Sequence, residues 1–279
     1  MTRMAKILVL ISCLSLIFPL QNYVYSDETS KTKSEMEMNY RKLLSAEFKD
    51  RIDAVHYFYK LRNDSLDKQY VAALVDLFKI EERNKQKVKD FFSGGGTSAK
   101  LPKDIAYVNT RPYGLYYLYL CRLISKSADK SLLNLVLRSC MDPESISNFG
   151  EDAVEPVVNA LKASENPEGK ASRIMVLGEM LKAKKTGYVA RGDTRNKIKG
   201  LLIQFVKDND RYVRSASVQA LGASRDKDVI PIIDDVAKND PYFYEKKDES
   251  TGKTEKVYPV RMKAKEVLEN LKKTESEKK

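Results

Sequence analysis

The chain has 279 residues, of which 42% are hydrophobic and 32% are charged, a globular composition with a strongly charged surface. Its length allows one large domain or two small ones. The 50 Lys and Arg residues outnumber the 39 Asp and Glu residues, so the formal net charge of +11 indicates either an anionic partner or a soluble lysine-rich protein. One His and three Cys, far apart in sequence, argue against a zinc site, which needs three or four ligands.

The first 26 residues have the layout of a secretory signal peptide. Arg3 and Lys6 precede an apolar run from Ile7 to Leu20, and Val24-Tyr25-Ser26 then places small or modest side chains at the −3 and −1 positions of a cleavage site. The run is shorter than the roughly 20 residues that a transmembrane helix needs. We therefore expect cleavage after Ser26 and export to the periplasm or the cell surface.

Cys13 offers an alternative interpretation of this segment. The residues Leu10-Ile11-Ser12-Cys13 resemble the lipobox of bacterial lipoproteins. Only Ile7 to Ser12 would then form the apolar region, and the strongly apolar segment 14–20 would begin the mature chain. We therefore place the lipoprotein second to the secreted protein.

Polar tails are predicted at 27–35 and 272–279, on either side of a folded region at 36–271. Within this region, apolar residues recur at positions 0, 3, 4 and 7, which is one face of a helix. Five segments fit the spacing: 71–78, 133–140, 154–161, 198–205 and 229–236.

A second kind of helix lies between these. Residues 170–178 align with 214–222 at an offset of 44, and 260–268 repeat the pattern again. Two kinds of helix thus alternate with a period of about 30–47 residues, which is typical of an α-solenoid.

The segment DNDRYVRSASVQALGASRDKDVIPIIDD (208–235) resembles a HEAT repeat, especially the short HEAT-like type also found in phycobilin lyases. The resemblance rests on Val213-Arg214, Ala220-Leu221-Gly222 and Val229-Ile230-Pro231. It extends over about 149–270 and is looser over 34–140. It implies an all-α, right-handed α-solenoid of HEAT-like helix pairs. It also implies a structural hydrogen-bonded ladder of Asp208 and Arg214, with Arg261 as the matching residue of the last helix.

Local signals support these helices. Asp210 is placed to cap the helix at 211–222, and Gly222 is expected to end it. Two segments depart from the repeat: 91–112, an inserted loop with three consecutive glycines, and 242–260, a charged hairpin turning at Thr251-Gly252. The stretch 138–150 does not resolve into a helix.

Catalytic chemistry finds little support. His56 lies beside the apolar face of its helix, and no nucleophile motif accompanies it. Cys121 and Cys140 remain after cleavage, and they are either a disulfide in an oxidising compartment or two buried thiols. We expect no enzyme, no cofactor and no metal, and we keep a hydrolase or lyase as a distant third possibility.

Two surfaces are candidates for binding. The basic segment 182–199 is net positive and joins one repeat to the next. It is either a solvated loop or an edge that binds a polyanion through Lys184, Lys185, Arg191, Arg195 and Lys197. The tyrosine-rich segment 111–123 is either core or a protein interface through Tyr117 and Tyr119.

The sequence therefore predicts a non-enzymatic, exported repeat scaffold that presents a concave helical face to a protein partner in the cell envelope. The alternative is a protein that binds an anionic polymer or surface, such as cell wall, lipid headgroups or nucleic acid, through the basic edge.

Overall fold

The computed structural model describes residues 33–61, 68–127, 129–140, 142–182, 188–247 and 252–276. The predicted signal peptide at 1–26, most of the first predicted tail, and Lys184 and Lys185 lie outside these ranges. The chain divides into two compact units, 1–38 and 39–279. The described part of the first unit is the beginning of helix α1 (Lys33–Leu43).

The N-terminal half of the second unit is built on long helices. They are α2 (Phe48–Lys60), α3 (Lys68–Ser93) and α4 (Arg111–Lys126), and α4 packs against both α2 and α3. Their shared core holds the fully buried side chains of Phe58, Phe78, Tyr116 and Leu120. Phe78 closes the first predicted helical template, so that template does mark the buried face of α3.

The inserted loop is shorter than the predicted segment 91–112, and part of it is packed against α3. Helix α3 continues to Ser93, and the short 3₁₀ turns η2 (Ser98–Lys100) and η3 (Ala106–Asn109) follow. Leu101 and Ile105 pack against Val88 of α3 and form a small core of their own. Burial of Leu101 and Ile105 therefore holds this part of the loop in a defined conformation against α3.

Short elements connect the two halves. They are η4 (Lys130–Leu132), α5 (Leu133–Ser139), α6 (Pro143–Ser147) and η5 (Gly150–Ala153). The stretch without a clear helical pattern thus contains a five-residue helix, whose first turn Asp142 caps by accepting the Ser145 N–H. A disulfide joins Cys121 of α4 to Cys140 at the end of α5, with Cα atoms 6.3 Å apart.

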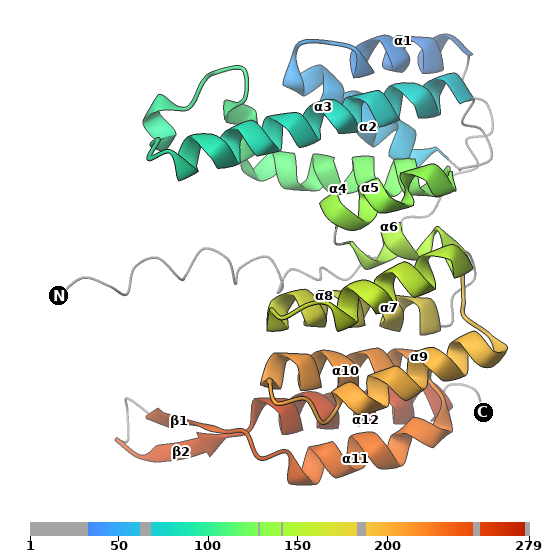
Figure 1. Cartoon of the computed structure of the whole chain (residues 1–279), viewed down its shortest axis with the longest axis vertical. Helices are drawn as coiled ribbons and strands as arrows, with labels where there is room; N and C mark the ends of the chain where they lie inside the picture. Colours follow the sequence, from blue (N-terminus) through green and yellow to red (C-terminus); the bar gives the residue numbers. More distant parts are fainter. Residues whose placement is uncertain are drawn as a thin grey trace. The chain divides into compact units, whose positions relative to one another are not determined.

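The C-terminal half consists of regular helix pairs. The helices are α7 (Val154–Lys162), α8 (Pro167–Leu181), α9 (Gly192–Phe205), α10 (Arg211–Ser224), α11 (Ile230–Asn239, preceded by the 3₁₀ turn η6 at Lys227–Val229) and α12 (Pro259–Ser276). Helix α10 packs between α8 and α12, while α7 packs on α8, α9 on α10 and α11 on α12 (Figure 1). The two kinds of helix that the sequence offset distinguished therefore form two rows. The predicted all-α solenoid with one inserted hairpin is confirmed.

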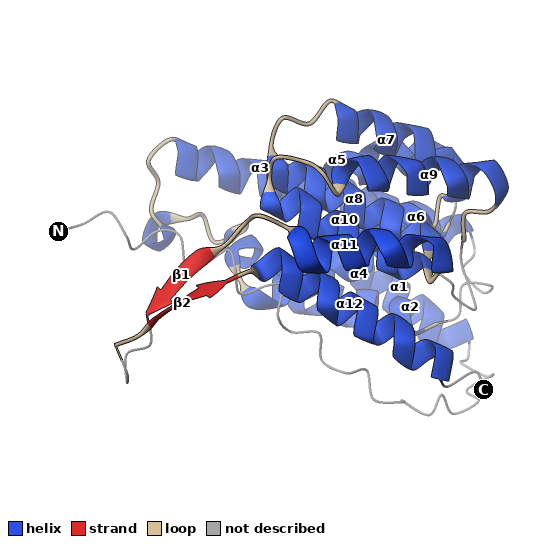
Figure 2. Ribbon diagram, turned by 90° about the horizontal axis from the view of Figure 1, so that it is seen from below, coloured by secondary structure: helices blue, strands red, loops and turns tan. Residues whose placement is uncertain are grey.

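The hairpin itself follows the prediction closely. Strands β1 (Tyr244–Lys247) and β2 (Thr254–Val257) pair antiparallel, with Tyr244 opposite Val257 and Lys247 opposite Thr254. The ribbon extends away from the helices (Figure 2). The boundaries of the predicted tails shift, because α1 already begins at Lys33 and α12 continues to Ser276.

Gly222 does not end its helix, contrary to the prediction. Helix α10 runs on to Ser224, and Arg225 ends it in the left-handed conformation with φ of 57°. A Cβ atom on Gly222 would lie 2.2 Å from the Val267 Cγ1 atom of α12. A Cβ atom on Gly178, at the matching position of α8, would lie 2.8 Å from the Ala220 Cα atom of α10. These glycines therefore allow close approach of successive helices in one row.

Replacing Gly178 by Ala is expected to lower the free energy of unfolding by about 1–3 kcal/mol, because the added methyl group meets the backbone of α10. Urea denaturation of the purified chain measures the change. Gly200→Ala in α9 is the matched control, since a Cβ atom there would have no neighbour within 4 Å, and it should gain about 0.5–1 kcal/mol from helix propensity. Equal effects of the two substitutions would contradict the close-approach role.

Candidate functional site

Arg214, in the first turns of α10, connects successive repeat units. Its Nε and Nη2 atoms donate to the two carboxylate oxygens of Asp240, at 2.6 and 3.0 Å. Its Nη1 atom donates to the main-chain carbonyls of Asp208 and Asn209, at 3.0 and 2.9 Å. The Arg214 and Asp240 side chains are 9% and 3% exposed, and the bonded carboxylate raises the pKa of the guanidinium. This geometry is a buried, bidentate ion pair with a structural role.

The carboxylate partner differs from the one that the resemblance implied. Asp208 offers Arg214 only its backbone carbonyl, because its side chain accepts the Asp210 N–H and lies 3.6 Å from the Lys170 ammonium. Arg261 continues the series by donating from Nε to the Asp240 carbonyl at 2.7 Å. We call Lys170, Asp208, Arg214, Asp240 and Arg261 the repeat ladder.

The N-terminal half contains an equivalent arginine that was not predicted from the sequence. Arg51 of α2 donates to the carbonyls of Ser45 and Ala46, six and five residues earlier, which is the spacing from Arg214 to Asp208 and Asn209. It also lies 3.4 Å from the buried carboxylate of Glu81. Burial raises the pKa of Glu81 against the opposing effect of hydrogen bonds from Tyr107 and Tyr116. The shared spacing of Arg51 to Val55 and Arg214 to Val218 was the available signal.

The basic edge proposed for polyanions is mostly neutralised within the described residues. Arg195 forms a bidentate pair with Asp226, at 3.0 and 2.8 Å, and also donates to the carbonyl of Ser224. Lys197 pairs with Glu155. Carboxylates distant in sequence thus pair with both cations, and the polyanion role of Arg195 and Lys197 stays a prediction. Arg191 is exposed.

Asp226 at this edge receives a second cation. Lys199 lies 3.0 Å from Asp226 and 2.7 Å from Asp228. Although burial would raise the pKa of Asp226, hydrogen bonds from Arg195 and Lys199 hold it below its usual value. The ionised carboxylate thus fixes the loop after α10 to the beginning of α9, which is a structural function.

The tyrosine prediction is also corrected in part. Tyr117 is buried: its ring stacks on Phe78 with centroids 5.5 Å apart, and its hydroxyl bonds to Glu82. Burial raises the pKa of that hydroxyl. Tyr117 is therefore a core residue and not a protein interface. Tyr119 is half-buried and stacks on Tyr59, with centroids 4.1 Å apart.

His56 occupies no visible catalytic arrangement among the described residues. Its ring meets Tyr119 edge-on, with centroids 5.1 Å apart, and burial lowers its pKa. In the described part of the chain, no group of three or more His, Cys, Asp and Glu side chains is placed to hold a metal ion. No described helix is long and apolar enough to span a membrane.

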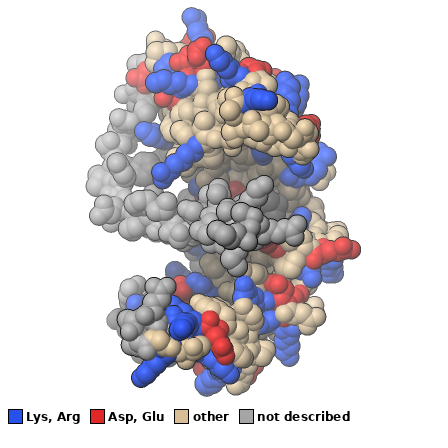
Figure 3. Space-filling model, turned by 90° about the vertical axis from the view of Figure 1, so that its left-hand side faces the viewer, with Lys and Arg blue, Asp and Glu red and all other residues tan. Residues whose placement is uncertain are grey.

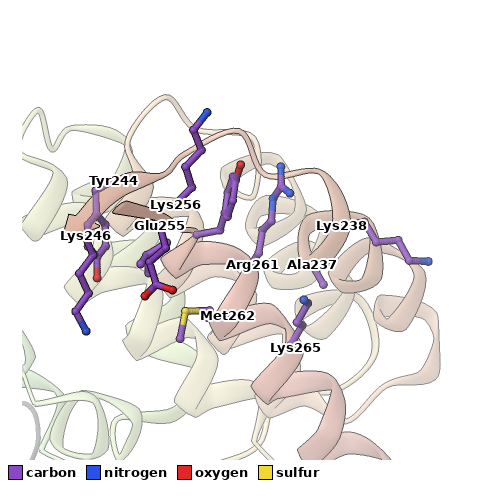
Figure 4. Close-up of a pocket in the computed structure, with 11 residues that line it drawn as sticks. Ala237, Lys238, Tyr244, Lys246, Glu255, Lys256, Arg261, Met262 and Lys265 are labelled. Atoms are coloured by element: carbon purple, nitrogen blue, oxygen red, sulfur yellow. The ribbon is translucent and has the colours of Figure 1, made fainter. Parts of the chain in front are cut away.

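Exposed cations and apolar side chains gather at the hairpin. A cavity of about 670 Å³ separates the hairpin from α11 and α12 (Figure 4). We call it the hairpin groove. Its lining consists of Ala237, Lys238, Tyr244, Lys246, Glu255, Lys256, Val257, Tyr258, Arg261, Met262 and Lys265. The sequence predicted only an insertion between helices here. The groove could not be predicted, because its lining residues come together only in the folded chain, from the hairpin, α11 and α12.

The alternating rows of helices and the ladder between them define the chain as an α-solenoid repeat protein. Residues 154–248 match the family of HEAT repeats, so this part of the chain is a HEAT-repeat segment. The match covers the most regular helix pairs and β1 of the hairpin. No match to the chain was found among curated proteins or among solved structures.

Proposed function

We propose that this protein is an exported, non-enzymatic scaffold that binds a protein partner in the cell envelope. The observation that carries the proposal is the HEAT-repeat segment at 154–248, because HEAT repeats generally serve as protein-interaction scaffolds. The repeat ladder supports it, since the buried Arg214–Asp240 pair and the partly exposed Lys170–Asp208 pair hold successive helices in a fixed arrangement for recognition.

Two features support export. The N-terminal sequence has the charge and apolar pattern of a signal peptide. The disulfide between Cys121 and Cys140 is of the kind that persists in oxidising compartments and is rare in the cytosol. The neutralised basic edge gives the polyanion alternative no comparable support.

The test begins with the full chain expressed with its own N-terminus. We expect the protein in the envelope fraction, with an intact mass that corresponds to residues 27–279 and one disulfide. A lipid-modified mass beginning at Cys13 would select the lipoprotein alternative instead. A chain that is recovered in the cytosol, unprocessed and reduced would contradict export.

The scaffold role is tested in the same cells with a photo-crosslinking residue at exposed positions, one variant for each position. A discrete protein adduct at one surface, and none at the exposed Lys162 of α7, is the expected result. Adducts of equal intensity at every position would indicate random collision and contradict a scaffold with a defined interface.

A further inference from the structure

The inner face of the hairpin is defined by its register. Tyr244 pairs with Val257 and Lys246 pairs with Glu255, so alternation along both strands places these four side chains on one face. All four line the hairpin groove, opposite Met262 and Lys265 of α12. Figure 4 shows Lys246 and Glu255 pointing to the side of the hairpin where Met262 lies, and Lys256 pointing the other way.

The groove is cationic, and part of its charge is uncompensated. Lys238 pairs with Asp234, and Arg261 is held by the Asp240 carbonyl. Lys246 and Lys265 form no ion pair with any described carboxylate. Glu255 is the single carboxylate of the lining, so an occupant that carries negative charge would be attracted to two available ammonium groups.

Apolar side chains are exposed beside these lysines. Tyr244 and Met262, which line the groove, are 45% and 60% exposed. Aromatic and Met side chains are enriched at the centres of protein interfaces, whereas exposed clusters of them are uncommon elsewhere. Figure 3 looks onto the side of the molecule from which the hairpin projects, and Lys and Arg side chains lie there among Asp and Glu side chains at the lower end of the view. The groove therefore provides charged and apolar contacts to the same partner.

Backbone groups of the hairpin favour an extended occupant. The two strands pair only with each other in the described structure, so each has an outer edge of unpaired main-chain donors and acceptors. An extended segment can add to such an edge, with alternate side chains facing the groove. A two-stranded ribbon is marginal alone, and a third strand would stabilise it.

We propose that the hairpin groove binds an extended acidic segment of a partner protein, with acidic side chains at Lys246 and Lys265 and an apolar side chain at Tyr244 and Met262. This inference rests on the proposed scaffold function and assigns its binding site. A membrane is disfavoured because the two lysines line a hollow rather than a flat face.

The test uses the purified, oxidised chain and a short fluorescent peptide with Glu and Val in turn at every second residue and Ser between them, so that one face of the extended peptide carries both acidic and apolar side chains; binding is followed by anisotropy. We expect saturable binding that the double variant Lys246→Glu/Lys265→Glu weakens about tenfold or more, because two attractive contacts become repulsive. Met262→Ala should weaken it as well. The same peptide with Lys in place of each Glu should not bind.

The matched control is Lys162→Glu/Lys207→Glu, two exposed lysines away from the groove with the same change in net charge. It should bind the acidic peptide within about twofold of the unmodified chain, since distant surface charges are screened. Equal loss in both double variants would show a non-specific charge effect and overturn the site. Tighter binding of oligothymidylate or of phosphatidylglycerol vesicles would overturn the assigned partner class.

The experiments distinguish failure of the scaffold function from failure of the groove assignment. If a discrete partner crosslinks elsewhere on the chain and the acidic peptide does not bind, the scaffold function stands and the groove assignment falls. If the peptide binds at the groove but no discrete partner crosslinks in cells, the scaffold function falls.

Discussion

Replacing Arg214 by Met is expected to lower the free energy of unfolding by about 3–5 kcal/mol. The substitution keeps an unbranched apolar stem but leaves the buried carboxylate of Asp240 without its bidentate partner. It also leaves the Asp208 and Asn209 carbonyls without the Nη1 donor. Chemical denaturation followed by circular dichroism measures the loss.

Arg191→Met provides the control for this substitution. Arg191 is exposed and also lies at the beginning of a helix, so the same chemical change there should alter stability by about 0.5 kcal/mol or less. The double variant Arg214→Met/Asp240→Leu should recover part of the loss, because no buried charge is then left unpaired. A single variant as stable as the control would show that the repeat ladder contributes nothing.

Reducing the disulfide between Cys121 and Cys140 is expected to lower the free energy of unfolding by about 3 kcal/mol. The two cysteines are 19 residues apart in the sequence. Closing a loop of this length with a covalent bond removes conformational freedom mainly from the unfolded chain. Denaturation with and without a phosphine reductant, on the same protein, measures the effect without changing any side chain volume.

The disulfide's position explains why the effect should matter for the fold. It ties α4 to the segment between α5 and α6, which have only seven and five residues and bury few side chains of their own. The double variant Cys121→Ala/Cys140→Ala should show no response to the reductant. A response of that variant, or none from the unmodified chain, would contradict the prediction.

Helix positions and the hairpin were predictable from the sequence because their signals are local. An apolar face repeats within four residues; the template at 154–161 lies on α7, and the one at 229–236 begins at the end of η6 and continues on α11. The hairpin was visible from a charged, polar segment with a glycine at its turn. The structural role of Arg214 also followed, since an arginine among apolar residues of a packed helix needs internal partners.

Pairings between units were decided only by the tertiary structure. Asp240 lies 26 residues after Arg214, and Asp226 lies 31 residues after Arg195. Nothing local distinguishes Asp240 from Asp208 as the partner of Arg214, because both stand beside the same helix pair. The choice depends on which carboxylate the stacking of units brings to the guanidinium.

The same reason explains the other corrections. Gly222 has the sequence signature of a helix end. In the structure it lies inside α10, where the absence of a side chain leaves room for Val267 of the next helix in its row. Tyr117 is buried because Phe78 and Glu82 of α3 meet it. By itself, the sequence determined the period of the repeat, the helices and the hairpin, which short-range spacing encodes. The ladder partners, the neutralised basic edge and the hairpin groove were decided by tertiary packing, because each unites side chains from different units.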